Sequence, residues 1–396
     1  MMMMNGRMLI LLALIALLGA CDEDRPRSGK TGAQKPTPTA GSAPGANGWP
    51  LYRGNAALNG VASGRLPDQG EIAWTFETKG AVTASPVVQD GVVYVGSCDQ
   101  KMYAIDLKTG KEIWSFETDD MIEAPAMVFE GRLYFGSCDF FFYALDSKTG
   151  ELKWKYETGE KIMGSPSGFR AKDGTLRVVV GSHDGSLYCF NGAGQKMWTY
   201  TTDNFVNGTP AMLDGKIVFG GCDAVLHIVS TETGGSLDKI ELGADCHVAG
   251  SVALAGGKVF FGHYGNQFIC ADLEEAKLEW DYPSPRHGFF SSPAIGKDRV
   301  VFGGRDRHIH CVGRSDGKPK WKFKTGRKVD ASPVICGNRV VCGSGDGRLY
   351  VIDLKTGKKV WSYEIGQPIF SSAAVVDGMI IVGSNDKRLY AFKSGM

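Results

Sequence analysis

The chain has 396 residues, and its 44 lysines and arginines nearly balance 43 aspartates and glutamates, which leaves a net charge of +1. This balance argues against a nucleic-acid-binding protein, because such proteins normally carry a basic excess. Glycine is abundant at 54 residues, proline is not at 16, and 43% of the residues are apolar. Without a collagen-like period, this composition indicates many turns between short strands and argues against disorder or long helices.

The first residues have the pattern of an export signal. Arg7 precedes an apolar run over residues 8–18 that is too short to span a bilayer as a stable helix. The following Leu18-Gly19-Ala20-Cys21 resembles a bacterial lipobox. The resemblance implies a signal peptide over residues 1–20, cleavage before Cys21 and lipid attachment to its sulfur. An ordinary secretory signal with a chance cysteine is the alternative.

The lipobox also implies a location. A doubly or triply acylated cysteine holds a protein stably on a membrane, so we expect a lipoprotein that faces the periplasm, with the outer membrane favoured. Asp22 follows the cysteine, and in enteric bacteria an aspartate there tends to retain a lipoprotein at the inner membrane, which stays an alternative. Residues 21–48 are rich in Pro, Gly, Ser, Thr and charge and contain no large apolar residue, which predicts a flexible tether.

From residue 49 onward, the sequence repeats. Seven tryptophans and one vacant position, held by Asp238, recur at an average spacing of 41 residues. The tryptophans are Trp74, Trp114, Trp154, Trp198, Trp280, Trp321 and Trp361.

Each unit predicts four short antiparallel strands. In the unit from Ser85 to Thr118, apolar residues alternate on both sides of Asp90-Gly91, the signal of a two-residue hairpin. A third strand follows, and the turn at residues 108–111 leads to a fourth strand that holds Trp114. Four strands every 40 or so residues are typical of a β-propeller blade, whose faces are covered only when neighbours stack.

The two ends of the chain predict how the ring closes. The last unit stops after its third strand, Leu389–Phe392, and an unpaired outer strand, Glu71–Thr78, precedes the first complete unit. Joined, they make an eighth blade and remove the open edges. We therefore expect an all-β, eight-bladed propeller as a single domain over residues 49–396. Seven blades is the alternative, should the Asp238 unit be irregular.

The repeats carry a family resemblance. AIDLKTGKEIW (Ala104–Trp114), ALDSKTGELKW (144–154) and VIDLKTGKKVW (351–361) resemble the tryptophan-docking motif of the pyrroloquinoline-quinone (PQQ) repeat, and WPLYRGNAALNG (49–60) resembles the lead-in of such proteins. The resemblance implies that each Trp packs between blades, near a Gly turn. Two subfamilies are relevant: BamB-type lipoprotein scaffolds of the outer-membrane barrel-assembly machinery and quinoprotein dehydrogenases.

The number of cysteines argues against a complete disulfide framework, because nine remain besides Cys21 and an odd number cannot all be paired. Several occupy repeated positions, such as the one that Ala104 holds in its unit, where a free cysteine acts as a small buried apolar residue. Equivalent positions on adjacent blades should lie about 10 Å apart, too far to share one zinc ion. We therefore expect no metal at Cys98, Cys138, Cys222 and His183, which share one slot in successive units. A Cys336–Cys342 disulfide is possible and not favoured.

Candidate binding residues come from the loops that enter the innermost strands, since these converge at one mouth of the axial channel. The residue two before the strand-opening Ser is predicted to face the axis. In chain order this slot holds Thr83, Glu123, Met163, Asn207, approximately His247, Phe290, Asp330 and Phe370. Carboxylate and amide oxygens suit calcium, so Glu123, Asn207 and Asp330 are a possible ligand site. In quinoprotein alcohol dehydrogenases a Glu and an Asn hold calcium and an Asp is the base.

Other features depart from those dehydrogenases. The chain has no adjacent Cys-Cys pair, no Trp in the axial slots, no C-x-x-C-H for haem and no long insertions over the channel. We therefore expect a monomeric, non-catalytic scaffold without cofactor or metal. The resemblance implies protein partners, such as a BamA-like barrel-assembly subunit. A PQQ- and calcium-dependent dehydrogenase and a lipoprotein that binds a small ligand or carbohydrate are the alternatives.

Overall fold

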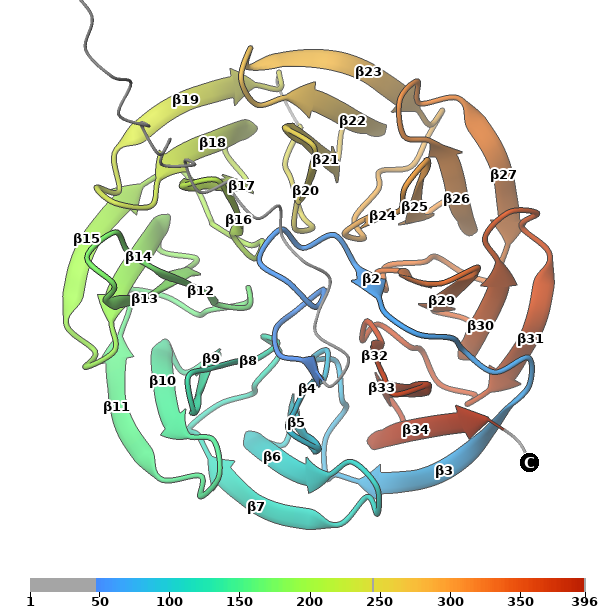
Figure 1. Cartoon of the computed structure of the whole chain (residues 1–396), viewed down its shortest axis with the longest axis horizontal. Coiled ribbons are helices and arrows are strands. Elements are labelled where there is room, and N and C mark those ends of the chain that lie inside the picture. The colour runs from blue at the N-terminus through green and yellow to red at the C-terminus, as the bar shows by residue number, and fades with distance from the viewer. Residues whose placement is uncertain (1–47, 244–245, 395–396) are drawn as a thin grey trace, which may run out of the picture. The chain divides into compact units, whose positions relative to one another are not determined.

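A computed structural model describes residues 48–243 and 246–394 (Figure 1). The predicted signal peptide, Cys21 and nearly all of the predicted linker lie outside these ranges. The described residues form eight sheets and no helix, and so contain no helix that could cross a membrane. Each sheet contains a four-stranded antiparallel blade, and two of the sheets gain a short fifth strand. This confirms the eight-bladed all-β propeller and excludes the seven-bladed alternative.

The blades follow one another in chain order around the axis (Figure 1). From the axis outward, blades 1 to 4 consist of β4 (Val87–Gln89), β5 (Val92–Gly96), β6 (Lys101–Asp106) and β7 (Glu112–Glu117); β8 (Met127–Phe129), β9 (Arg132–Gly136), β10 (Phe141–Asp146) and β11 (Leu152–Glu157); β12 (Ser167–Arg170), β13 (Leu176–Gly181), β14 (Ser186–Asn191) and β15 (Lys196–Thr201); and β16 (Ala211–Leu213), β17 (Lys216–Gly220), β18 (Val225–Ser230) and β19 (Ser236–Glu241).

Blades 5 to 8 consist of β20 (Ala253–Ala255), β21 (Lys258–Gly262), β22 (Gln267–Asp272) and β23 (Lys277–Pro283); β24 (Ala294–Ile295), β25 (Arg299–Gly304), β26 (His308–Gly313) and β27 (Pro319–Lys324); β28 (Val334–Cys336), β29 (Arg339–Gly343), β30 (Arg348–Asp353) and β31 (Lys359–Glu364); and β32 (Ala374–Val376), β33 (Met379–Ser384), β34 (Arg388–Ser394) and β3 (Gly70–Glu77). Two short strands, β1 (Gly48–Trp49) and β2 (Val61–Ala62), join the inner edges of blades 1 and 7.

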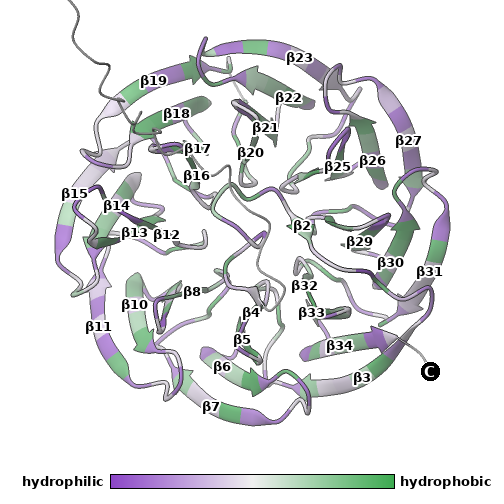
Figure 2. Ribbon diagram, in the orientation of Figure 1, coloured by the Kyte–Doolittle hydropathy of each residue, from purple (hydrophilic) through white to green (hydrophobic). Residues whose placement is uncertain are grey.

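The hairpin between the first two strands of a blade follows from its sequence. In blade 1, Gln89 pairs with Val92 across Asp90 and Gly91, whose φ angles are 52° and 77°. Two successive positive φ angles are the requirement of a type I′ turn, which Asp-Gly satisfies. The second and third strands are mostly buried, whereas the outermost strand alternates between exposed and half-buried residues. Figure 2 shows hydrophobic and hydrophilic residues alternating along the outermost strands. Stacking of neighbouring blades covers the apolar strands.

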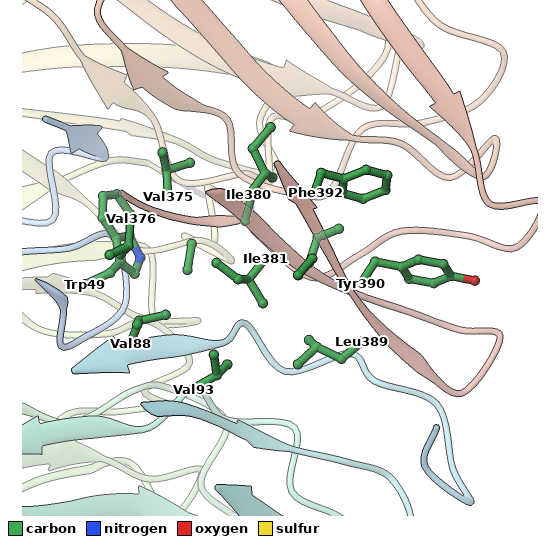
Figure 3. Close-up of a cluster of buried hydrophobic side chains, with 14 of the residues drawn as sticks. Trp49, Val88, Val93, Val375, Val376, Ile380, Ile381, Leu389, Tyr390 and Phe392 are labelled. Carbon is green, nitrogen blue, oxygen red and sulfur yellow. The ribbon is translucent and has the colours of Figure 1, made fainter. Parts of the chain in front are cut away.

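The ring closes between the two ends of the folded chain. Strand β3 pairs antiparallel with β34, so the N-terminal segment supplies the outer strand of blade 8, as the sequence predicted. Buried side chains of blades 8 and 1 form one apolar cluster across this closure, which includes Ile381, Leu389, Val93 and Trp49 (Figure 3). A pairing between distant chain segments makes the ring free of an open edge.

Seven joints between blades share one contact. In each of these joints the outer-strand tryptophan lies against a glycine of the next blade, as Trp114 lies against Gly150. Six of the glycines are in turns, and the seventh, Gly70, begins β3. A Cβ on any of these glycines would sit 2.5–2.7 Å from an indole atom, so only glycine fits there. In six joints the indole Nε1 also donates to a carbonyl of the next blade, for example Trp74 to Leu107 O at 2.8 Å. The pairs are Trp74–Gly110, Trp114–Gly150, Trp154–Gly194, Trp198–Gly234, Trp280–Gly317, Trp321–Gly357 and Trp361–Gly70.

Strand order gives the propeller two distinct faces. We call the face that carries the connections between blades, together with the turns between second and third strands, the mouth face. The opposite face carries the turns between first and second strands and between third and fourth strands, and we call it the hairpin face. The predicted axial slots lie in the connections and so belong to the mouth face.

The segment 48–62 crosses the axis and joins the inner edges of most blades (Figure 1). Its carbonyl oxygens accept backbone hydrogen bonds from blades 2, 4, 5, 6 and 7, for example Pro50 O from Val128 N at 2.7 Å and Asn59 O from Ile295 N at 2.8 Å. Arg53 is 1% exposed and donates to Pro293 O and Pro333 O. A Cβ on Gly60 would overlap its guanidinium. This segment therefore packs as part of the core and closes the axis on the hairpin side.

Candidate functional site

The predicted axial residues come together in one cavity on the axis, with a volume of about 170 Å³. Tyr52 of the crossing segment is among its lining residues. Seven of the eight slots named from the sequence line it: Thr83, Glu123, Met163, Asn207, Phe290, Asp330 and Phe370. The repeat therefore brings together residues that are up to 287 positions apart in the chain.

The eighth slot differs from the sequence prediction. Ala249 lines the cavity, whereas the His247 side chain binds the Cys222 carbonyl oxygen through Nδ1. The cause is a longer connection in this unit, since thirteen positions separate Asp238 from Ser251, against eleven from Trp198 to Thr209. Counting at the average repeat length therefore placed the predicted axial slot two residues too early in the chain, at 247 instead of 249.

The strand-opening residues, two positions after the axial slots, form a ring of hydroxyl groups around the axis. Six of the eight strand-opening residues donate their backbone N–H to the hydroxyl of the next blade, as Ser251 N does to Ser292 Oγ at 2.9 Å. Pro125 of blade 2 has neither the N–H nor the hydroxyl, and it interrupts the ring. The Tyr52 hydroxyl bonds to Ser292 Oγ and Ser332 Oγ, which fixes it at the axis. The bonds run from Ser165 to Thr209, Ser251, Ser292, Ser332, Ser372 and Ser85.

The three oxygen-bearing candidates have different surroundings. Asp330 binds Arg305 through both carboxylate oxygens, at 3.0 and 3.3 Å, and Lys328 at 2.7 Å. Glu123 accepts a hydrogen bond from Thr83 Oγ1 at 3.4 Å. Asn207 donates its Nδ2 to Cys222 Sγ at 2.9 Å. The structure thus gathers all three residues around one cavity, and Asp330 is already neutralised by two cations.

A family model described as outer membrane protein assembly factor BamB matches residues 59–201, 222–323 and 283–395. The chain belongs to this family. A search of curated proteins finds no match. Among solved structures, BamB from Moraxella catarrhalis is 16% identical with a TM-score of 0.69, and the match covers 82% of this chain and 98% of that one.

Quinoprotein enzymes are also structurally similar to this BamB-family chain. A europium-containing methanol dehydrogenase is 14% identical with a TM-score of 0.74, over 88% of this chain and 98% of the other. Quinohemoprotein alcohol dehydrogenase from Comamonas testosteroni is 15% identical with a TM-score of 0.73, over 89% and 82%. At these identities the likeness shows the shared propeller fold alone.

The axial cavity is a poor fit for a quinone with calcium. Pockets for small-molecule ligands usually measure about 300–1,000 Å³, and this one measures about 170 Å³. The carboxylate of Asp330 would have to leave both Arg305 and Lys328 to act as a base.

Burial raises the pKa values of the thiols near the mouth of the cavity. Burial raises the pKa of Cys138 to about 12, and the negative charge of Glu123 adds to the effect. Burial also raises the pKa values of Cys98 and Cys222 above their usual range. A raised pKa lowers the fraction of thiolate, which is the nucleophilic form of cysteine. Cys336 and Cys342 are free thiols on one hairpin, where Cys336 pairs with Arg339 rather than with Cys342.

Proposed function

We propose that this BamB-family protein is a non-catalytic scaffold that binds protein partners through its mouth face. The observation that carries the proposal is the axial cavity, which is small, is lined by Tyr52 of the crossing segment and contains an aspartate already bound by two cations. A rigid disc of this kind presents loops and strand edges, and partners dock on both.

The mouth face also exposes apolar side chains on its loops. Met121 is 38% exposed, Phe140 39%, Phe205 46% and Tyr264 48%. Large apolar and aromatic groups that project from loops are common anchors of protein interfaces. They support the mouth face as the surface that meets a partner.

The family and the lipobox suggest where the scaffold works. We propose a lipid anchor at Cys21 and a location facing the periplasm, on the outer membrane, with Asp22 favouring the inner membrane in some bacteria. The crossing segment begins beside the hairpin of blade 1, where Gly48 pairs with Gln89. A BamA-like barrel-assembly subunit is the proposed partner.

Site-specific photo-crosslinking in native membranes tests this function. A photoreactive residue replaces Phe205 on the mouth face, and the matched control replaces the similarly exposed Leu278 on β23. We expect mass spectrometry to find a barrel-assembly subunit crosslinked through position 205 and depleted at position 278. Products without any barrel-assembly subunit would contradict the proposed role.

A PQQ- and calcium-dependent dehydrogenase is the second candidate, favoured by Glu123, Asn207 and Asp330 lining one cavity. It predicts that the purified protein takes up PQQ with calcium, gains the absorbance of the quinone and oxidises alcohols or sugars with an artificial dye. No uptake of PQQ under saturating conditions excludes it. Uptake of PQQ by the wild type that the variant Glu123→Gln abolishes would favour the dehydrogenase over the scaffold function.

A further inference from the structure

The mouth face carries a cluster of positive charge around blade 6. Three segments form it: the connection 284–291, the turn 304–308 and the connection 325–331. Together they contain five cationic side chains and two carboxylates, a net charge of +3, while the whole chain carries only +1. The cations are Arg286, Arg305, Arg307, Arg327 and Lys328.

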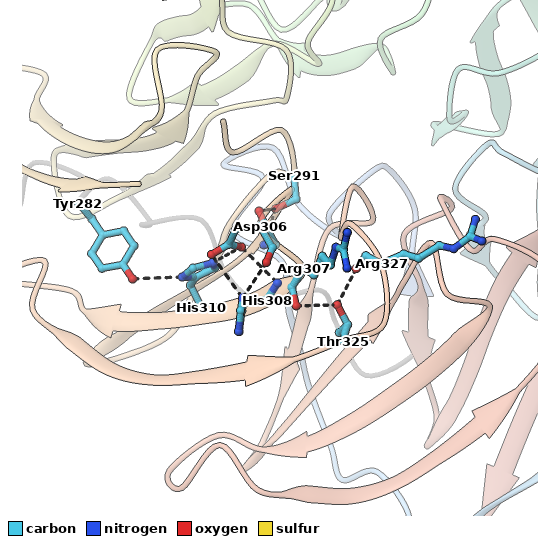
Figure 4. A network of polar contacts seen from close by, with 9 residues as sticks. Tyr282, Ser291, Asp306, Arg307, His308, His310, Thr325 and Arg327 are labelled. Atoms are coloured by element: carbon cyan, nitrogen blue, oxygen red, sulfur yellow. Dashed lines mark hydrogen bonds and ion pairs between the residues drawn. The ribbon is translucent and has the colours of Figure 1, made fainter. Parts of the chain in front are cut away.

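Backbone hydrogen bonds hold the three segments together. Arg305 N donates to Gly288 O at 3.5 Å, and Val329 N donates to Gly304 O at 3.1 Å. The Thr325 hydroxyl contacts both Arg307 O and Arg327 O, at 2.9 and 2.7 Å (Figure 4). The cations therefore project from a fixed backbone, which lowers the entropy lost when a partner binds them.

Both carboxylates of the cluster already bind side chains of this protein. Asp306 binds His310 Nε2 at 2.9 Å (Figure 4), and Asp330 binds Arg305 and Lys328. The Arg305 guanidinium also lies 3.6 Å from the centre of the Phe290 ring. Within the described part of the chain, the exposed side chains of Arg286, Arg307 and Arg327 have no ion pair.

The opposite side of the same face carries the opposite charge. Around blade 2, the equivalent segments 118–124, 137–141 and 158–164 contain five carboxylates and one lysine, a net charge of −4. Three blades lie between blade 2 and blade 6 in either direction around the eight-bladed ring, so the two clusters lie on opposite sides of the axis (Figure 1). The mouth face is therefore electrically bipolar.

We propose that the positive cluster of blade 6 binds an acidic segment of a partner polypeptide on that side of the mouth face. The proposal rests on the scaffold function and names the chemistry of its partner. Complementary charge speeds encounter and fixes the orientation of a bound segment. An anionic membrane or a long nucleic acid fits less well, because either would bring negative charge against the −4 cluster of blade 2, whereas a narrow segment avoids it.

The test measures binding of one peptide to the purified full-length chain. The probe has eight glutamates alternating with glycine and carries an uncharged dye for fluorescence anisotropy. We expect binding at low salt that is lost at high salt, because exposed charges are screened within a few ångströms at about 1 M salt. The double variant R286E/R327E should weaken binding at least ~10-fold, in the range found for charge pairs across interfaces.

The matched control is K355E/K358E in the turn between β30 and β31, on the hairpin face. It changes the net charge by the same four units and should shift binding by less than about twofold. Equal binding by both variants, or no binding of the peptide at low salt, would overturn the proposal. The proposal would also be overturned if phosphatidylglycerol vesicles bound the wild type but not R286E/R327E, and the peptide bound neither.

This outcome is separable from that of the crosslinking experiment. Peptide binding that depends on Arg286 and Arg327, without barrel-assembly crosslinks, would support the acidic-segment site and contradict the barrel-assembly partner. Barrel-assembly crosslinks without peptide binding keep the scaffold and remove this site.

Discussion

The joint between blades 4 and 5 differs from the other seven joints of the ring in both residues of the shared contact. Asp238 replaces the tryptophan, and Ala276 replaces the glycine of the following turn, with φ +48°. Leu273 O, equivalent to the carbonyl that accepts the indole N–H elsewhere, accepts Lys216 Nζ at 3.3 Å. Because a Cβ at the glycine position would collide with an indole, alanine fits only where the tryptophan is absent. Indole and glycine are thus one structural unit.

Blade 5 has lost a second repeated contact beside this joint. In the other seven blades an aspartate bonds to the side chain four residues later, as Asp346 does with the Tyr350 hydroxyl at 2.8 Å. Blade 5 has Gly265 and Ile269 at these positions, and His263 stands where five other blades have a serine. The departures from the repeat therefore gather at one place in the ring.

The largest expected effect comes from breaking an ordinary joint. Trp154 packs among Tyr134, Phe142 and Phe190 at the joint of blades 2 and 3. Trp154→Ala should lower the free energy of unfolding by about 3 kcal/mol, because it removes a large packed side chain. Asp238→Ala, at the equivalent position of the exceptional joint, should change it by less than about 0.5 kcal/mol. Urea unfolding of both variants measures this difference, and equal losses would contradict it.

The regular part of this architecture was predictable because a propeller repeats one local pattern. The spacing of tryptophans gave the number of blades, and the missing fourth strand gave the closure that β3 makes with β34. The axial slots followed from the same period until the longer connection before Ser251 shifted the position from His247 to Ala249. Insertions of this kind are invisible to a count of average spacing.

Other features needed the three-dimensional arrangement. The net charge of +1 hides the two poles of the mouth face, because they cancel in the total and separate only when blades 2 and 6 are placed across a ring. The clamp on Asp330 joins Arg305 from a neighbouring blade, 25 positions away. The crossing segment resembled a lead-in sequence, but its hydrogen bonds to six blades depend on the closed ring.

A smaller effect should appear in the acid stability of blade 5. His263 is fully buried, and burial lowers its pKa to about 4, below the usual 6.5. The unfolded chain takes up a proton below pH 6.5 that the folded protein takes up only near pH 4. Stability is therefore present above pH 6.5 and is lost as the pH falls from 6.5 to 4, by about 2 kcal/mol at pH 5.

The variant His263→Ser restores the residue that other blades have at this position and removes the titrating group. We expect the loss of unfolding free energy between pH 7.5 and pH 5 to shrink by about 2 kcal/mol relative to the wild type. His287→Ser, which replaces an exposed histidine by serine, is the matched control. An unchanged pH dependence in His263→Ser would show that another group causes the acid loss.

The smallest effect comes from rebuilding the missing contact. Asp238→Trp alone should gain little, because the Ala276 methyl occupies the place of the indole. Ala276→Gly alone relieves a left-handed residue. Together they should stabilise the protein by roughly 1 kcal/mol beyond the sum of the single changes, as expected for residues in direct contact. A double-mutant cycle by urea unfolding measures this coupling, and the indole should then displace Lys216 from Leu273 O. Additive effects within about 0.3 kcal/mol would mean that the tryptophan and glycine were lost independently, and that aliphatic packing by Ile240 and Leu273 closes this joint without needing either.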